Sequence, residues 1–249
     1  MTENIFWPPA TPGIQLSSNE VHIWRARLDL DSPIPDYHST FLSNAEQKRA
    51  ASFMFAKDRD HFTLARIILR QLLGGYLGEP PQGVIIEILK HGKPALTGAA
   101  KIPSLRFNLS HSHGLALFAF CLAHEVGVDL EKIRPEVALE GIESNFSQRE
   151  RKELAALPLV FRPEGFFLAW TRKEAYVKAH GEGLEASLKG FDVSLTPEKP
   201  AELTSSDKEH WSLYSLHPGK EFVGALVVEG KEHRLRFCEW QKSSLFQSL

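Results

Sequence analysis

The alternation of hydrophobic and polar residues along the chain predicts a protein built from both strands and helices. Apolar residues occupy every second position over much of residues 21–28 and again over 126–131. A period of two is typical of a strand with one buried face. Other runs rich in apolar residues predict further strands, and these cover residues 84–89, 104–109, 115–123, 191–195, 211–216 and 222–228.

Helical periodicity is clearest over residues 58–76, where apolar residues recur at three- and four-residue steps. Glycines between positions 74 and 78 are expected to end this helix. A shorter helix before it begins with the capping-box spacing of Ser43 and Glu46, in which the two side chains satisfy exposed backbone N–H groups. The sequence therefore predicts a short helix followed by a long one.

The same pattern recurs later in the chain. A second capping box, Ser147 and Glu150, lies 104 residues after the first. A short apolar match between residues 62–65 and 166–169 shares that offset and falls in another predicted long helix. Features that share one offset favour an internal duplication over chance.

These elements predict an α+β fold of two pseudo-symmetric halves, residues 1–124 and 125–249. Each half is expected to pack one long helix on a small antiparallel sheet, with the active site in the cleft between the halves. Residues 1–20 read as an irregular lead-in and residues 242–249 as a tail.

Composition narrows the functional classes. The 249 residues are 43% hydrophobic and 24% charged, as in ordinary globular proteins, and the net charge of -2 gives no general attraction to nucleic acid or membrane. Two cysteines, Cys121 and Cys238, lie in apolar runs and predict buried free thiols in a reducing compartment. The N-terminus lacks the pattern of a signal peptide, and no apolar run is long enough to span a bilayer. We expect a soluble, cytoplasmic protein.

Acidic residues form the first candidate site. Asp129 and Glu131 fall on one face of a predicted strand, where two carboxylates repel each other unless a positive charge neutralises them. Glu174 and Lys178, four residues apart, share one face of a predicted helix. Three carboxylates near a lysine suit a divalent cation, magnesium or manganese, together with a phosphate. The plainer interpretations, a solvated strand face and an exposed helix pair contributing about 0.2–0.5 kcal/mol, stay open.

A second candidate is the segment Ser110-His111-Ser112, predicted to be a polar turn. Its side chains either cap the turn's own backbone or bind phosphate oxygens through hydroxyl and imidazolium donors. The basic turn that contains Lys93 is a weaker candidate, because turn lysines are usually solvated.

Four motifs follow one another between residues 92 and 184. They are Gly92-Lys93-Pro94, Phe107-Asn108-Leu109-Ser110-His111-Ser112, Gly127-Val128-Asp129-Leu130-Glu131-Lys132, and Trp170-Thr171-Arg172-Lys173-Glu174-Ala175-Tyr176-Val177-Lys178 with Gly181-Glu182-Gly183-Leu184. In this order they closely resemble the 4′-phosphopantetheinyl transferases of the surfactin (Sfp) type. The likeness runs from about residue 42 to residue 195, and the spaced combination is specific although each motif alone is not.

The resemblance implies a monomeric enzyme that moves the 4′-phosphopantetheine arm of coenzyme A onto a serine of an acyl or peptidyl carrier protein, releasing adenosine 3′,5′-bisphosphate. It implies that Asp129, Glu131 and Glu174 hold magnesium, that Glu174 is the base, and that Lys178 contacts the transferring phosphate. The same resemblance implies that the coenzyme's phosphates and nucleotide end are bound by Ser110, His111, Lys93 and, as weaker candidates, Lys57 and Arg49.

The chain departs from the family pattern at His113, where a small residue, usually glycine, is expected. Residues 145–165, which combine basic and apolar side chains, are a candidate surface for docking an acidic carrier protein, or else a plain connecting segment. Two other functions stay open at this point, a magnesium-dependent pyrophosphate hydrolase and a non-catalytic module that binds coenzyme A or carriers. The intact acidic motif favours the transferase.

Overall fold

The structure is a computed structural model. It describes residues 6–9, 15–29, 40–97, 104–136, 145–181 and 188–241. The predicted C-terminal tail, half of the N-terminal lead-in, and the Glu182-Gly183-Leu184 end of the last motif lie outside the described residues.

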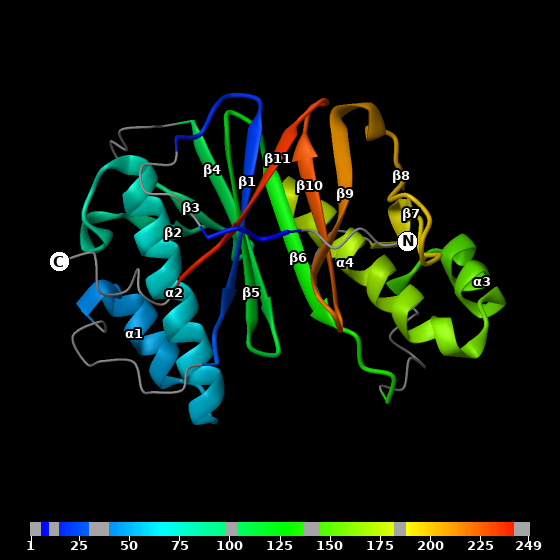
Figure 1. The fold of residues 1–249 in the computed structure, drawn as a ribbon, viewed down its shortest axis with the longest axis horizontal. Helices are drawn as coiled ribbons and strands as arrows, with labels where there is room; N and C mark the ends of the chain where they lie inside the picture. The colour runs from blue at the N-terminus through cyan, green and yellow to red at the C-terminus, as the bar shows by residue number, and fades with distance from the viewer. Residues whose placement is uncertain are drawn as a thin grey trace.

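Two sheets form the centre of the molecule (Figure 1). The first has the strand order β11-β1-β5-β4 and the second β6-β10-β9. The strands are β1 (Glu20–Arg27), β4 (Leu105–Ser112), β5 (Leu115–Leu122), β6 (Val126–Lys132), β9 (Trp211–Gly219), β10 (Phe222–Glu229) and β11 (Arg234–Glu239). Two small hairpins are β2 (Ile86–Ile88) with β3 (Pro94–Leu96), and β7 (Asp192–Val193) with β8 (Leu203–Thr204).

Helices cover the outer faces of these sheets (Figure 1). They are α1 (Asn44–Ala51), α2 (Ala56–Leu77), α3 (Gln148–Ala156) and α4 (Arg162–His180), with short 3-10 turns η2 (Pro81–Gly83), η4 (Leu159–Phe161), η6 (Leu188–Gly190) and η7 (Lys208–His210). The predicted α+β class is confirmed. No helix in the described parts of the chain is both long and apolar enough to cross a bilayer.

Three hydrophobic cores separate the four layers. One lies between α2 and the first sheet, one between the two sheets, and one between the second sheet and α4. Strand β5 contributes to two of them, because Phe118 and Phe120 face α2 whereas Leu117 and Ala119 face the second sheet. Burial on both faces explains why this strand is apolar throughout instead of alternating.

Two local predictions were wrong. The first sheet is not purely antiparallel, because β1 pairs in parallel with β11. The segment from Ser110 to Ser112 continues β4, paired with β5, and the turn is confined to the two residues that follow.

The predicted end of the long helix is confirmed. Helix α2 passes through Gly74 and Gly75 and is capped by Gly78, whose φ of 64° is the left-handed conformation that glycine adopts easily.

Both predicted capping boxes are confirmed at the starts of α1 and α3. Each capping glutamate also binds a cation on the following long helix. Glu46 accepts a hydrogen bond from Arg70 at 2.9 Å, and Glu150 lies 2.9 Å from the Lys173 ammonium. The caps therefore tie each short helix to its long neighbour.

The two cysteines are free and buried, as predicted. Burial raises the pKa of the Cys121 thiol to about 12, so this sulfur stays protonated and unreactive at neutral pH.

Candidate active site

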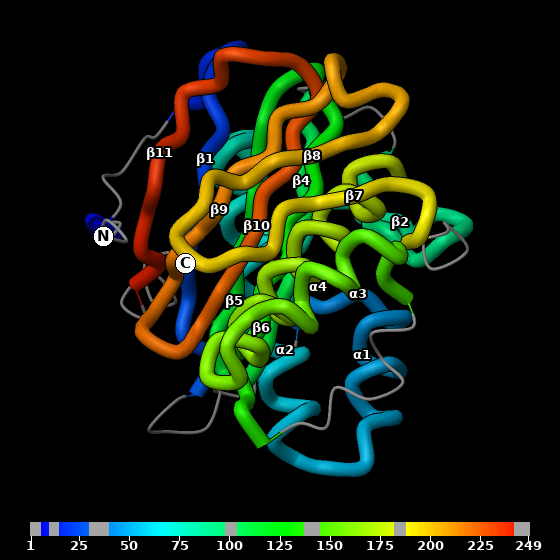
Figure 2. The backbone as a smooth tube through the Cα atoms, turned by 90° about the vertical axis from the view of Figure 1, so that its right-hand side faces the viewer, coloured from blue at the N-terminus to red at the C-terminus, as the bar shows by residue number. Residues whose placement is uncertain are grey.

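Helix α4 lies unusually close to strand β6, and Gly127 makes this possible. A Cβ atom at Gly127 would lie 2.0 Å from the Ala175 carbonyl oxygen and 2.4 Å from the Ala179 nitrogen. Figure 2 shows α4 crossing over β6 and β10. The close approach places the polar side chains of α4 beside those of β6, whose alternate residues Val126 and Val128 face the other sheet.

Asp129 is buried and is bound by residues from two other elements. Its Oδ1 atom lies 2.6 Å from the Lys178 ammonium of α4 and accepts a hydrogen bond of 2.9 Å from the Ser110 hydroxyl of β4. Lys178 also donates to the Ser110 hydroxyl at 3.2 Å. The other carboxylate oxygen, Oδ2, is buried without a hydrogen-bond partner within the described residues. An orphaned carboxylate oxygen is an acceptor that suits a cation or a donor from a ligand.

Glu131, on the same face of β6 as Asp129, accepts a hydrogen bond of 2.8 Å from the Ser112 hydroxyl. Ser112 is also 2.9 Å from the Nδ1 atom of His113 and accepts from the Lys132 backbone N–H. Because the single Ser112 hydrogen goes to the carboxylate, the imidazole must be the donor in the remaining contact. His113 has a φ of 47°, a left-handed conformation that is uncommon for a side chain larger than glycine.

The carboxylates of this region repel one another. Burial, reinforced by the charge of Asp129, raises the pKa of Glu174, and the Lys178 charge opposes this only in part. Burial also raises the pKa of Glu131, again with a contribution from Asp129. A cation would relieve this repulsion. In the described residues, however, no three His, Cys, Asp or Glu side chains are already gathered so as to hold a metal ion. Lys178 binds the Oδ1 atom of Asp129 and Ser112 binds the Oε2 atom of Glu131, so each of these carboxylates is already held through one of its two oxygens.

A pocket of about 400 Å³ lies beside this cluster. It is lined by residues of β4, of α4 and of the turn before β3. Its lining includes five of the predicted site residues, Lys93, Ser110, His111, Glu174 and Lys178. The pocket thus collects hydroxyl, imidazole, ammonium and carboxylate groups from segments far apart in the sequence.

The pocket also contains a residue that the sequence interpretation missed. Arg66 of α2 lines it, and the Nη1 atom of Arg66 is buried without a hydrogen-bond partner among the described residues. Burial lowers the pKa of Arg66. Burial also lowers the pKa of His111, another residue that lines the pocket, and the Lys178 charge lowers the pKa of His111 further. An anion would compensate both groups. The sequence could have indicated Arg66 as a functional residue, because it interrupts the apolar face of the helix between Phe62 and Leu69.

The other basic candidates are placed differently. Lys57 is exposed and forms an ion pair with Asp29 at 3.1 Å, and Arg49 lies over the ring of Phe53. Neither lines the pocket. Lys93 does line it, but its ammonium is bound to Glu125 at 2.8 Å.

Comparisons with known proteins show the family of the chain. A profile of the 4′-phosphopantetheinyl transferase superfamily matches residues 125–236, and a profile described as the N-terminal part of 4′-phosphopantetheinyl transferase matches residues 36–122. The 4′-phosphopantetheinyl transferase HetI of Nostoc sp. is 42% identical over 226 residues, covering 90% of this chain and 94% of HetI. The protein belongs to the 4′-phosphopantetheinyl transferase superfamily and is an enzyme of that class.

The Sfp-type resemblance is likewise confirmed. The 4′-phosphopantetheinyl transferase Sfp of Bacillus subtilis is 25% identical over 183 residues, covering 72% of this chain and 80% of Sfp. Among solved structures, a holo-(acyl-carrier-protein) synthase from Bacillus anthracis in complex with CoA (3′,5′-ADP) matches 43% of this chain and 96% of its own, with 31% identity and a TM-score of 0.34.

Proposed function

We propose that this protein transfers the 4′-phosphopantetheine arm of coenzyme A to a serine of an apo acyl or peptidyl carrier protein. The serine oxygen would form a bond to the phosphorus that carries the arm, while the bond from that phosphorus to the bridging oxygen breaks and adenosine 3′,5′-bisphosphate leaves. The observation that carries the proposal is the convergence of Ser110, His111, Glu174 and Lys178 in one pocket. Membership of the superfamily supports the reaction class.

The phosphates of coenzyme A would bind to the positively charged and hydroxyl groups of the pocket. Lys178 and Ser110 lie 3.2 Å apart and can share one phosphate oxygen. His111 and Arg66 line the same pocket and have pKa values lowered by burial, so an anion beside them would restore part of their lost solvation.

Asp129, Glu131 and Glu174 would hold magnesium, or manganese, in this proposal. Their carboxylate oxygens are the ligand type that such cations prefer, and the orphaned Oδ2 atom of Asp129 is available for one of these bonds. The bound ion would offset the negative charge that develops on the leaving phosphate.

Glu174 is the proposed base for the carrier serine, directly or through a water. Its raised pKa favours this role, because a carboxylate whose pKa lies closer to neutral accepts a proton more readily. The residue lines the pocket one helical turn before Lys178, so the base and the phosphate-binding cation come from the same face of α4.

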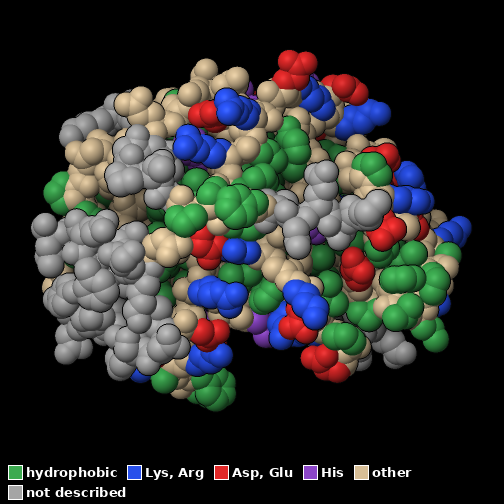
Figure 3. Space-filling view, in the orientation of Figure 1, with side chains coloured by type: hydrophobic (Ala, Val, Ile, Leu, Met, Phe, Trp, Pro, Cys, Tyr) green, Lys and Arg blue, Asp and Glu red, His purple; other side chains and the backbone are tan. Residues whose placement is uncertain are grey.

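We propose that carrier proteins dock at the segment formed by α3 and η4. The side chains of Leu159 and Val160 are 76% and 77% exposed, and Arg149 and Arg151 on α3 are exposed as well. Figure 3 shows hydrophobic and charged side chains mixed over the α3 end of the molecule. An acidic carrier with apolar positions around its serine would find a complementary surface there.

We further propose that residues 1–124 and 125–249 are duplicated halves with the pocket in the cleft between them. Support comes from the two capping boxes and from the capping glutamates, each bound to a cation on its long helix.

The test is intact mass spectrometry of a purified apo carrier protein incubated with this protein, coenzyme A and magnesium. A mass gain equal to the phosphopantetheine arm, abolished by a chelator and restored by added magnesium, is the expected result. Release of free phosphopantetheine with an unmodified carrier would instead establish a hydrolase. Binding of coenzyme A with no mass gain on fatty acid, polyketide and peptide carriers would overturn the proposal.

A further inference from the structure

We propose that Lys93 is a positioning residue, which fastens the C-terminal turn of α4 to the turn before β3, and not a ligand of the nucleotide. The consequence for coenzyme A rests on the proposed function, because it takes the pocket beside α4 as the coenzyme site. The contact itself is independent of that assignment.

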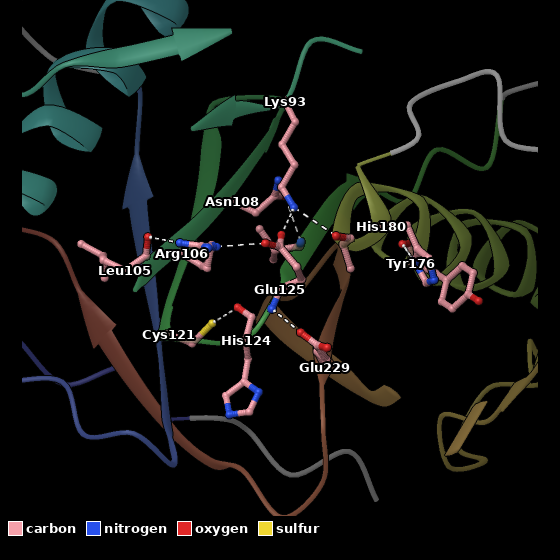
Figure 4. A network of polar contacts seen from close by, with 12 residues as sticks. Lys93, Leu105, Arg106, Asn108, Cys121, His124, Glu125, Tyr176, His180 and Glu229 are labelled. Carbon is pink, nitrogen blue, oxygen red and sulfur yellow. Dashed lines mark hydrogen bonds and ion pairs between the residues drawn. The ribbon is translucent and has the colours of Figure 1, made fainter. Parts of the chain in front are cut away.

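The Lys93 ammonium binds two groups from distant parts of the chain (Figure 4). It donates to the Glu125 carboxylate at 2.8 Å and to the Ala179 carbonyl oxygen at 3.0 Å. Ala179 lies in the last turn of α4, where carbonyl groups lack intrahelical partners and a positive charge is favoured by the helix dipole. The ammonium therefore acts as a C-terminal cap for the helix that carries Glu174 and Lys178.

The turn holds Lys93 in place for this contact. The Leu89 backbone N–H donates to the Lys93 carbonyl oxygen at 2.9 Å, and Gly92 supplies the left-handed φ of 86° that closes the turn. The apolar stem of Lys93 packs toward Gly181, where a Cβ atom would be 3.7 Å from Cδ. The side chain is only 11% exposed. Both its charge and its stem are thus engaged with the end of α4.

The Lys93 ammonium is engaged within the protein. Its partner Glu125 also accepts a hydrogen bond of 2.9 Å from Arg106, and the Glu125 backbone N–H donates to Glu229 at 3.1 Å (Figure 4). Burial alone would raise the pKa of Glu125, but Lys93 and Arg106 outweigh burial and lower it. Glu125 is therefore ionised at neutral pH and fixed between β4, β10 and the turn. The ammonium is thus held by an ionised carboxylate and by the Ala179 carbonyl oxygen, both of which are protein groups.

The sign of the change in coenzyme A affinity separates positioning from direct binding. We would measure the Kd of coenzyme A by calorimetry for Lys93→Met, Glu125→Gln and the double variant. Lys93→Met weakens binding in either case. If Lys93 positions α4, Glu125→Gln also weakens binding, by about fivefold to tenfold, and the double variant is no weaker than the worse single one, as for members of one salt-bridge network. If Lys93 binds a phosphate, Glu125→Gln frees its charge and tightens binding, and that result would overturn the proposal.

Lys90→Met is the matched control, since it removes one exposed lysine from the same turn without touching the pocket. It is expected to leave the Kd unchanged. Salt dependence gives a second criterion. Lys93→Met should retain the wild-type salt dependence of the Kd, whereas loss of a phosphate contact would reduce it.

A measurement made without coenzyme A tests this inference separately from the proposed function. Thermal unfolding of the unliganded variants should show a lower Tm for Lys93→Met and for Glu125→Gln, with little further loss in the double variant. Fully additive losses would refute the network. If wild-type protein fails to bind coenzyme A, the proposed function is refuted. The comparison of Tm values among wild type, the two single variants and the double variant then decides the role of Lys93.

Discussion

Replacing Gly127 by alanine should separate α4 from β6. The added Cβ atom would meet the Ala175 carbonyl oxygen at 2.0 Å and the Ala179 nitrogen at 2.4 Å. Both are backbone atoms, so neither can rotate away as a flexible side chain would. Ordinary van der Waals contact begins at 3.4 Å, and the helix must therefore retreat by the difference, about 1.4 Å, or the strand must distort by the same amount.

Two effects follow from that displacement. Overpacking of this kind destabilises a protein by about 1–3 kcal/mol. Lys178 lies 2.6 Å from the Asp129 carboxylate, and a shift of this size lengthens that contact beyond a hydrogen bond. Misplacement of a reacting group by about 1 Å can reduce the rate about a hundredfold, so we expect a loss of that order in turnover.

Urea unfolding and carrier modification, measured on the same preparations, test both effects. Gly75→Ala is the control, because nothing lies within 4 Å of its added Cβ atom and its helical position is exposed. That variant should be more stable than wild type by about 0.5–1 kcal/mol and should be fully active. A Gly127→Ala protein with wild-type stability and turnover would refute the reasoning.

Three further outcomes are expected. Asp129→Ala and Glu174→Gln abolish carrier modification without unfolding the protein. Burial and the Asp129 charge raise the pKa of Glu174 above its ordinary 4.5, so its ionisation destabilises the fold as pH rises. Calorimetry should therefore show a higher Tm for Glu174→Gln than for wild type at neutral pH, and the difference should shrink as the pH falls toward that ordinary value. Lys173→Met leaves Glu150, only 1% exposed, without its cation, and denaturant unfolding should show a loss of about 3–5 kcal/mol. His113→Gly removes left-handed strain of about 1 kcal/mol, and a Tm well below wild type would show that the Ser112 contact outweighs it.

The sequence predicted the local elements that carry the motifs. Period-two alternation placed Asp129 and Glu131 on one face of β6, and four-residue spacing placed Glu174 and Lys178 on one face of α4. The capping boxes were predicted because their hydrogen bonds join residues only three apart. Burial patterns and helix caps depend on residues that are close together in the sequence, so short segments are enough to predict them.

Long-range partners were not predictable in the same way. The pairing of Lys93 with Glu125 and Ala179 depends on how a hairpin meets a helix whose end lies more than 80 residues later. The hydrophobic periodicity of the sequence contains no information on such a contact. The strand character of Ser110 to Ser112 was masked by polar residue types that are typical of turns. Pairing with the strongly apolar β5 overrode that local preference.

The parallel pair of β1 and β11 has a consequence for how the chain is made. Glu20 pairs with Arg234 and Arg25 with Glu239, so one edge of the first sheet is completed by the last of the described strands. During synthesis β1 would be exposed on the ribosome with an open edge until β11, more than 200 residues later, has emerged. Fragments that stop before β11 would retain the four sequence motifs but present that edge to other chains. Insoluble aggregates are therefore the expected fate of premature termination, even when every site residue is present.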